Sequence, residues 1–309
     1  MKKKILIAAL TGAGLLLSGI AGGHRALAAE TTPTAAVATK DADPALWVIK
    51  DADTTIYLFG TVHILKPGLS WFDEGVEKAF KESGELVLEL PEADEGAMQK
   101  TMMSVGIDKD GQTLSKRLNA DQLAIYTKAM ESIKVPPAAF DPFEPWAASL
   151  VLSVLPLAQS GYDAKSGADE VLKAAAKAAG KPIIGLETVE QQLGYFDTLP
   201  MNLQIDYLVQ MAKDVGDVVP TLSKMIDNWA AGDPETLATM MNTAMDKSPE
   251  VKRILLAERN ERWAAWIKTR LEKPGTVFIA VGAGHLAGKD SVQDYVTKQK
   301  IGTVTRVKY

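Results

Sequence analysis

The sequence contains no cysteine, and it has only three histidines among 309 residues. Without cysteine the chain has no disulfide, no thiolate metal site and no lipid-anchoring cysteine, so its stability must come from a hydrophobic core. The motifs H-E-x-x-H and G-x-S-x-G are also absent. Their absence excludes a helix-borne zinc protease site and a serine hydrolase with a nucleophile elbow.

Residues 1–28 have the features of a signal peptide. A start with three lysines precedes a long apolar run, and Ala26 and Ala28 form a small-x-small cleavage site. We therefore expect cleavage after Ala28, a flexible leader at 29–44, and export to the periplasm or secretion. A retained membrane anchor is the alternative interpretation, because the apolar run is long.

The chain that remains after cleavage is acidic. Four of the 34 basic residues leave with the signal peptide, which changes the formal charge from −5 to about −9. Such a charge argues against nucleic acid as a partner, and we expect no membrane span in this part of the chain. His24 is also removed, so only His63 and His285 remain, and each follows a glycine three positions earlier.

Apolar runs typical of strands alternate with stretches of helical spacing along the chain. The strand-like runs are a hairpin at 45–61, then 85–90, 182–187, 276–281 and 303–308, and the run at 182–187 is expected to be a buried strand. The main helical stretches are 71–83, 94–158, 168–179, 188–271 and 290–299. This alternation predicts an α/β fold over residues 45–309, with a central mixed β-sheet and helical insertions.

Polar residues mark the starts of several predicted helices. Asp169 is expected to cap the helix that Gly180 ends. Asp233 and Ser248 each precede a proline, as a cap residue does before a proline at the first helical position. Thr188 is a candidate cap for the helix that follows 182–187.

Four of the predicted strands end at a histidine or a glutamate. The ends carry His63, Glu89, Glu187 and His285. In open α/β sheets, ligands bind beyond the carboxyl ends of the strands, where loops from several strands meet. We therefore predict a shared site, although each residue also has an ordinary interpretation as a surface histidine or as part of a helix start.

The segment VKRILLAERNERWAAWIK, residues 251–268, has an apolar stripe that also carries Glu258, Arg259 and Arg262. Charges on a core-facing stripe must be paired or must face a site, because burying an unpaired charge is costly. One interpretation is an internal network of ion pairs. The other is an arginine that faces an anionic ligand or a developing oxyanion.

Several segments resemble the TraB/GumN family, whose eukaryotic relatives include the Tiki proteases. The resemblance spans residues 45–309 and rests on the paired Gly-x-x-His motifs with the GLET and ERN blocks between them. It implies an α/β fold related to erythromycin-esterase-like proteins. Because the Tiki relatives are metal-dependent proteases, it also implies that His63 and His285 are metal ligands.

The leading hypothesis is a metal-dependent hydrolase that acts on a peptide or a small molecule. Glu89 or Glu187 would complete the shell or act as general base, and Arg259 would contribute to catalysis. Nitrogen and carboxylate ligands suit Zn²⁺, Mn²⁺, Co²⁺ or Fe²⁺. Two alternatives remain: a metal-free esterase with a histidine base, and a non-catalytic binder that holds haem through its histidines or a ligand through its methionine-rich helices.

Overall fold

The computed structural model describes residues 39–90, 95–245 and 248–309. The predicted signal peptide and most of the predicted leader lie outside these residues. Strand β1 (Lys40–Asp41) pairs in parallel with β4 (Leu69–Ser70), and Ala42 beside it is buried. Residues 40–42 belong to the predicted flexible leader at 29–44, but here they pair with β4 or are buried.

A six-stranded mixed sheet forms the centre of the fold, as the sequence predicts. Its strands are, in spatial order, β6 (Ile183–Gly185), β5 (Glu85–Leu88), β7 (Gly275–Gly282), β3 (Thr54–Thr61), β2 (Leu46–Lys50) and β8 (Val304–Arg306). The predicted hairpin is the antiparallel pair β2–β3, and β8 pairs antiparallel with β2. Strands β3, β7, β5 and β6 run parallel to one another. Their carboxyl ends therefore meet at one edge of the sheet.

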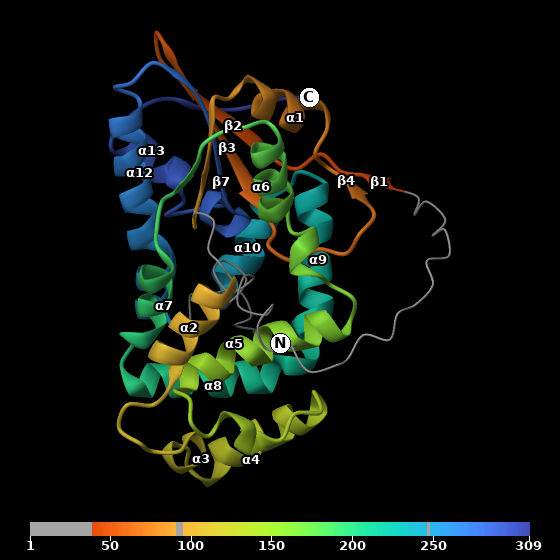
Figure 1. Ribbon diagram of the computed structural model, residues 1–309, viewed down its shortest axis with the longest axis vertical. Helices are drawn as coiled ribbons and strands as arrows, with labels where there is room; N and C mark the ends of the chain where they lie inside the picture. The colour runs from red at the N-terminus through yellow and green to blue at the C-terminus, as the bar shows by residue number, and fades with distance from the viewer. Residues whose placement is uncertain (1–38, 91–94, 246–247) are drawn as a thin grey trace.

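The sheet separates two hydrophobic cores. Ile279 of β7 belongs to one core, and its neighbours Phe278 and Ala280 belong to the other. This division follows from the alternation of side chains along a strand. Helices α12 (Glu258–Arg270) and α13 (Val292–Lys298) cover the first face, and α1 (Glu74–Glu82) and α6 (Ala168–Ala178) lie over the second (Figure 1).

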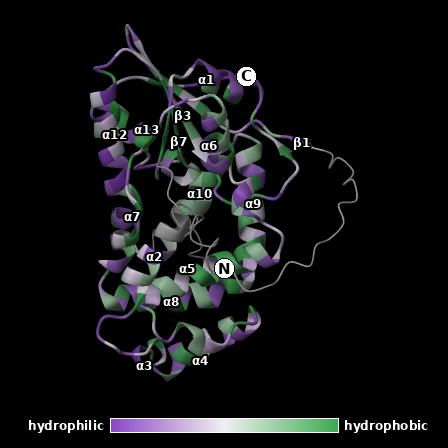
Figure 2. Ribbon diagram, in the orientation of Figure 1, coloured by the Kyte–Doolittle hydropathy of each residue, from purple (hydrophilic) through white to green (hydrophobic). Residues whose placement is uncertain are grey.

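Long helical insertions extend from the sheet between β5 and β6 and between β6 and β7 (Figure 1). Besides α6 and α12 they contain α2 (Glu95–Gly106), α3 (Leu114–Arg117), α4 (Ala120–Ser132), α5 (Pro145–Gln159), α7 (Val189–Asp197), α8 (Met201–Asp214), α9 (Val218–Ala230), α10 (Pro234–Met245) and α11 (Pro249–Lys252). Helix α5 is hydrophobic and buried along most of its length (Figure 2), and it packs against α8 and α9. Within the three described ranges, no helix is both long and apolar enough to cross a membrane.

Two details of the predicted elements differ from the structure. The strand predicted at 182–187 is not buried: β6 is an edge strand, and each of its residues is half-buried. Ser248 begins α11 without a side-chain capping bond, whereas Oδ1 of Asp233 accepts from the backbone N–H of Thr236 as a cap should. Thr188 caps α7 in a reciprocal pair with Gln191. The structure therefore confirms helix starts after Thr188, Asp233 and Ser248, but only Thr188 and Asp233 accept a capping bond through their side chains.

Candidate functional site

The four parallel strands bring His63, Glu89, Glu187 and His285 to one edge of the sheet. Strands β3 and β7 are in register up to Thr61 and Gly282, so the two histidines follow paired positions. His285 lies in the short helical turn η5 (Ala283–Leu286). The backbone N–H of Glu187 donates to the carbonyl of Glu89 at 2.8 Å, which continues the β5–β6 pairing into the site.

Arg259 lies at the centre of this edge, with 3% of its surface exposed. Its Nη2 donates to Oε2 of Glu89 and to Oε2 of Glu187, both at 2.7 Å, and its Nε donates to Oε1 of Glu187 at 2.9 Å. Its Nη1 lies 3.2 Å from Nε2 of His285. Burial by itself lowers the pKa of Arg259, but the two carboxylates outweigh that effect and hold the pKa above its ordinary value.

His285 is fully buried and held as a neutral ring. Its Nδ1 lies 2.6 Å from Oδ1 of Asn260, whose Nδ2 donates to the carbonyl of Asp290 at 2.7 Å. Because the amide nitrogen is used in that second bond, the ring faces an amide oxygen, so Nδ1 carries the proton. Burial, the charge of Arg259 and the nearby His63 all lower the pKa of His285 well below its ordinary value. Its Nε2 is therefore an acceptor directed at Arg259.

His63 is the most exposed of the five predicted site residues, at 8%. Its Nε2 lies 3.9 Å from Oε1 of Glu89, and Nε2 of His285 lies at the same distance from that oxygen. Its Nδ1 lies 3.2 Å from Oδ1 of Asp169. The prediction that Asp169 caps α6 is wrong: Gly167 is the N-cap, and Asp169 is a buried residue of the first turn that faces His63.

The glycines of the two Gly-x-x-His motifs allow the close approach that the sequence suggested. A Cβ on Gly60 would lie 3.0 Å from the Cα of Ala283, so β3 could not approach the η5 turn with a larger residue. A Cβ on Gly282 would lie 3.0 Å from Oε1 of Glu89 and 3.3 Å from Nε2 of His63. The backbone N–H of Gly282 also donates to that glutamate oxygen at 2.7 Å. Gly282 therefore keeps a space open between the carboxylate and His63.

Helix α7 supplies partners for the glutamates that the sequence did not suggest. Nε2 of Gln192 donates to Oε2 of Glu89 and to Oε2 of Glu187, both at 3.1 Å. The hydroxyl of Tyr195 donates to Oε1 of Glu187 at 3.3 Å. Gln192 and Tyr195 are three residues apart on a helix that starts just after Glu187, so they share one face of it. This spacing was the signal in the sequence that could have indicated contacts with the glutamates.

Only one of the three charges on the predicted stripe is buried. The side chains of Glu258 and Arg262 are 41% and 49% exposed, whereas that of Arg259 is 3% exposed. A π-helical turn, Arg253–Ala257, ends just before α12 begins, and the carbonyl of Leu255 accepts from Nη1 of Arg259 at 3.3 Å. Such wide turns often occur at functional sites.

Each histidine Nε2 lies farther from Glu89 than two ligand atoms of a tetrahedral metal site lie from each other. Two ligand atoms on bonds of about 2.1 Å at a tetrahedral angle lie about 3.4 Å apart. Each histidine Nε2 lies 3.9 Å from Oε1 of Glu89, and Arg259 already donates to Nε2 of His285. Over the described ranges, no group of three or more His, Asp or Glu side chains is arranged to hold a metal ion. The metal ligands that the family resemblance implies stay a prediction.

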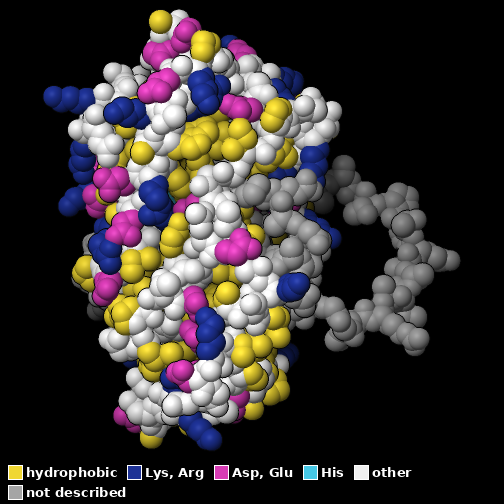
Figure 3. All heavy atoms as spheres, turned by 60° about the vertical axis from the view of Figure 1, so that its left-hand side comes forward, with side chains coloured by type: hydrophobic (Ala, Val, Ile, Leu, Met, Phe, Trp, Pro, Cys, Tyr) yellow, Lys and Arg dark blue, Asp and Glu magenta, His cyan; other side chains and the backbone are white. Residues whose placement is uncertain are grey.

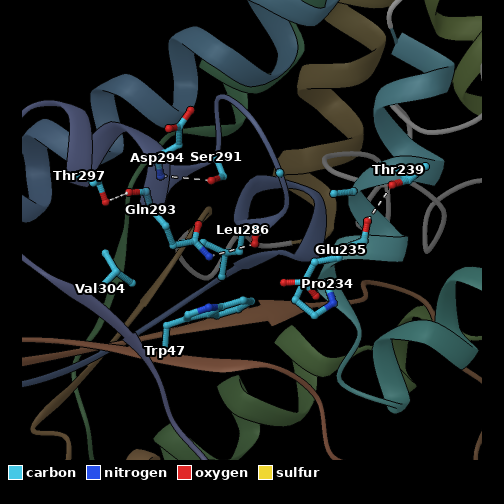
Figure 4. A pocket seen from close by; sticks show the side chains of 12 residues that line it. Trp47, Pro234, Glu235, Thr239, Leu286, Ser291, Gln293, Asp294, Thr297 and Val304 are labelled. Carbon is cyan, nitrogen blue, oxygen red and sulfur yellow. Dashed lines mark hydrogen bonds between the residues drawn. The ribbon is translucent and has the colours of Figure 1, made fainter.

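A separate hollow of about 720 Å³ lies beside η5 and α13 (Figure 4). Its lining includes Trp47 of β2, Glu235 of α10, Leu286 of η5, and Gln293 and Asp294 of α13. None of the five predicted site residues lines it. The face shown in Figure 3 mixes basic and acidic side chains and shows no histidine, in agreement with the burial of His63 and His285.

Comparisons with known proteins point to one family. The protein YbaP of Escherichia coli (strain K12) is 25% identical over 253 residues, which are 81% of this chain and 90% of that protein. An uncharacterized protein of Treponema pallidum (strain Nichols) is 22% identical over 273 residues, covering 82% of this chain and 80% of the relative. No solved structure matches the chain. The model of the TraB/PrgY/gumN family matches residues 45–306, and the chain therefore belongs to that family.

Proposed function

We propose that the site is a hydrolase centre in which His63 acts as the general base. The observation that supports this proposal is the placement of two histidines, from opposite ends of the chain, against the same carboxylate oxygen beside a buried arginine. General bases in hydrolysis are most often histidines, and they need a neighbour that stabilises the protonated ring. Glu89 is such a neighbour for His63.

The two histidines differ in their ability to accept a proton. Arg259 is paired with both glutamates, and Arg262 lies 4.0 Å from Glu187. Two carboxylates, Glu89 at 3.9 Å from Nε2 and Asp169 at 3.2 Å from Nδ1, lie beside the His63 ring and can stabilise the proton that it accepts. At His285 the guanidinium opposes protonation. His63 is therefore the base, and His285 is a neutral acceptor that helps to hold Arg259.

The reaction we propose is hydrolysis of an ester or amide bond. A water molecule gives a proton to Nε2 of His63 while its oxygen attacks the carbonyl carbon. The five N–H groups of Arg259 are all directed at groups of the cluster, so its part in this proposal is to hold Glu89, Glu187 and His285 in place. When the carbonyl re-forms and the bond to the leaving group breaks, His63 returns the proton to the leaving oxygen or nitrogen, so the enzyme regains its initial state.

The test is hydrolysis of p-nitrophenyl esters and fluorogenic peptides by the full chain. We expect activity that falls at least about 100-fold in His63→Gln, as removal of a general base does. Glu235→Gln, at the rim of the hollow in Figure 4, is the matched control and should retain activity. Activity that His63→Gln leaves unchanged contradicts the proposal, as does a lack of hydrolysis on both substrate classes.

Metal dependence stays the competing form of this function. It is suggested by the family resemblance and by the space beside Gly282, where Glu89 and both histidines meet. Metal analysis of the purified protein tests it. One equivalent of metal that is lost in both His63→Gln and His285→Gln would support the metal-dependent reaction, whereas hydrolysis by a chelator-treated, metal-free preparation would support the histidine base.

We also propose that the protein is exported, on the basis of residues 1–28, which lie outside the described residues. The cationic start, apolar run and Ala26-x-Ala28 site support this proposal. Cell fractionation with sequencing of the amino terminus tests it. A protein that begins at Ala29 in the periplasm or medium is expected, and an uncleaved cytoplasmic chain would contradict export.

A further inference from the structure

The first turn of α6 is attached directly to the segment that carries His63. The backbone N–H of Ala168 donates to the carbonyl of Val62 at 2.9 Å. The Cα of Gly167 lies so close to the carbonyl of His63 that any Cβ there would clash with it. Asp169 directly follows Ala168, so these contacts of Gly167 and Ala168 fix its position relative to the backbone that carries His63.

The carboxylate of Asp169 is buried beside the His63 ring. Asp169 is 6% exposed, and its Oδ1 lies 3.2 Å from Nδ1 of His63. The two atoms form a close ion-pair contact rather than a hydrogen bond, and the negative charge of the carboxylate attracts a proton to the nearer ring nitrogen. A neutral imidazole then has its lone pair on Nε2, the nitrogen that faces Glu89.

We propose that Asp169 is a positioning residue that keeps the proton of neutral His63 on Nδ1 and so directs the Nε2 lone pair into the site. This assignment deepens the proposed function and rests on it where activity is concerned. The tautomer itself does not depend on the reaction, because the carboxylate determines it in the absence of substrate.

His285 provides an internal comparison for the assignment. Its Nδ1 faces Oδ1 of Asn260, a neutral amide oxygen, at 2.6 Å. Both rings therefore carry the proton on Nδ1, but only His63 has a charged partner that can also stabilise a protonated ring. The carboxylate beside Nδ1 of His63 suits a general base, and the neutral amide beside Nδ1 of His285 suits a neutral acceptor.

Nitrogen-15 NMR of histidine side chains tests the assignment on the full chain, which contains only three histidines. We expect the Nδ1–H tautomer at His63 in the wild type. In Asp169→Ala the signal should shift toward the Nε2–H tautomer, while the His285 signals stay unchanged and report that the fold is intact. Asp169→Asn should keep the Nδ1–H tautomer, because its amide oxygen can accept from Nδ1–H as that of Asn260 does at His285. Glu170→Gln removes the adjacent charge from the same helix start and is the matched control.

In the hydrolysis assay, we expect kcat to fall about 100-fold in Asp169→Ala, the loss typical of a residue that orients a reactive imidazole. KM and the kcat of Glu170→Gln should change little. An Nε2–H tautomer in the wild type, or no shift in Asp169→Ala, overturns the proposal even if hydrolysis is observed. A correct tautomer shift in a protein that hydrolyses nothing supports the positioning role and counts against the proposed function alone.

Discussion

Replacing Arg259 by methionine should destabilise the protein strongly, because two buried carboxylates would lose their counter-charge. Glu89 and Glu187 are each 5% exposed, and both accept from Nη2 of the arginine at 2.7 Å. Removing one partner of a buried ion pair typically costs about 3–5 kcal/mol. For a chain of this size, about 2–4 °C is lost per kcal/mol, so we expect the Tm to fall by about 6–20 °C.

The loss of stability should arise from the two carboxylates that no longer have a counter-charge. A double variant tests this. In Arg259→Met with Glu187→Gln, only one buried negative charge remains, and Gln192 and the N–H of Gly282 still donate to Glu89. The two substitutions together should therefore cost about 1–3 kcal/mol less than the sum of their separate effects.

Thermal and denaturant unfolding of the variants measures these differences. Arg262→Met is the matched control, since Arg262 is 49% exposed and only 4.0 Å from Glu187, a contact worth less than about 1 kcal/mol. If Arg259→Met costs no more than Arg262→Met, or if the double variant is strictly additive, then the buried arginine does not neutralise the two glutamates as described.

The remaining predictions concern the two Gly-x-x-His turns. Gly282→Ala should abolish hydrolysis, because its Cβ would lie 3.0 Å from Glu89 and 3.3 Å from His63, whereas Gly84→Ala, whose Cβ has only a 3.7 Å contact, should retain activity. His285 has a lowered pKa in the folded state, so the unfolded chain binds more protons below about pH 6.5, and stability should decrease as pH falls below that value. The decrease attributable to His285 is at most about 1.4 kcal/mol per pH unit, and unfolding curves of His285→Gln should lack it. Added haem should give no shifted absorption band, since Nε2 of His285 faces Arg259 and Nε2 of His63 faces Glu89; a band lost with either histidine would favour the haem-binding alternative.

The ends of the four strands could be predicted from local signals. An apolar run that ends in glycine and histidine, or in glutamate, indicates the end of a strand. Their convergence followed from the general rule that parallel strands place their carboxyl ends together, and the long-range pairing of β3 with β7 brings His63 and His285 to the same edge. The burial of β6 could not be read in this way, because an edge strand and a central strand have similar short apolar sequences.

The partners of the histidines could not be predicted, because they depend on the rotation of helices about their axes. Asp169 lies two residues beyond the N-cap, Gly167, and at that position its side chain faces His63. Along α11, the π-helical turn and α12, every fourth residue from Val251 to Ile267 is buried, and Arg259 lies on that row. Glu258 occupies the adjacent row at the edge of the stripe, which a sequence pattern does not separate from its centre.

The charged groups beside each ring explain why His63 and His285 are given different roles. Carboxylates of Glu89 and Asp169 lie beside the His63 ring, whereas the guanidinium of Arg259 lies beside Nε2 of His285. His285 contacts Arg259, and His63 contacts Asp169. Two identical motifs at the ends of two neighbouring strands therefore produce two different histidines. The difference arises from Arg259 and Asp169, which come from helices that neither motif contains.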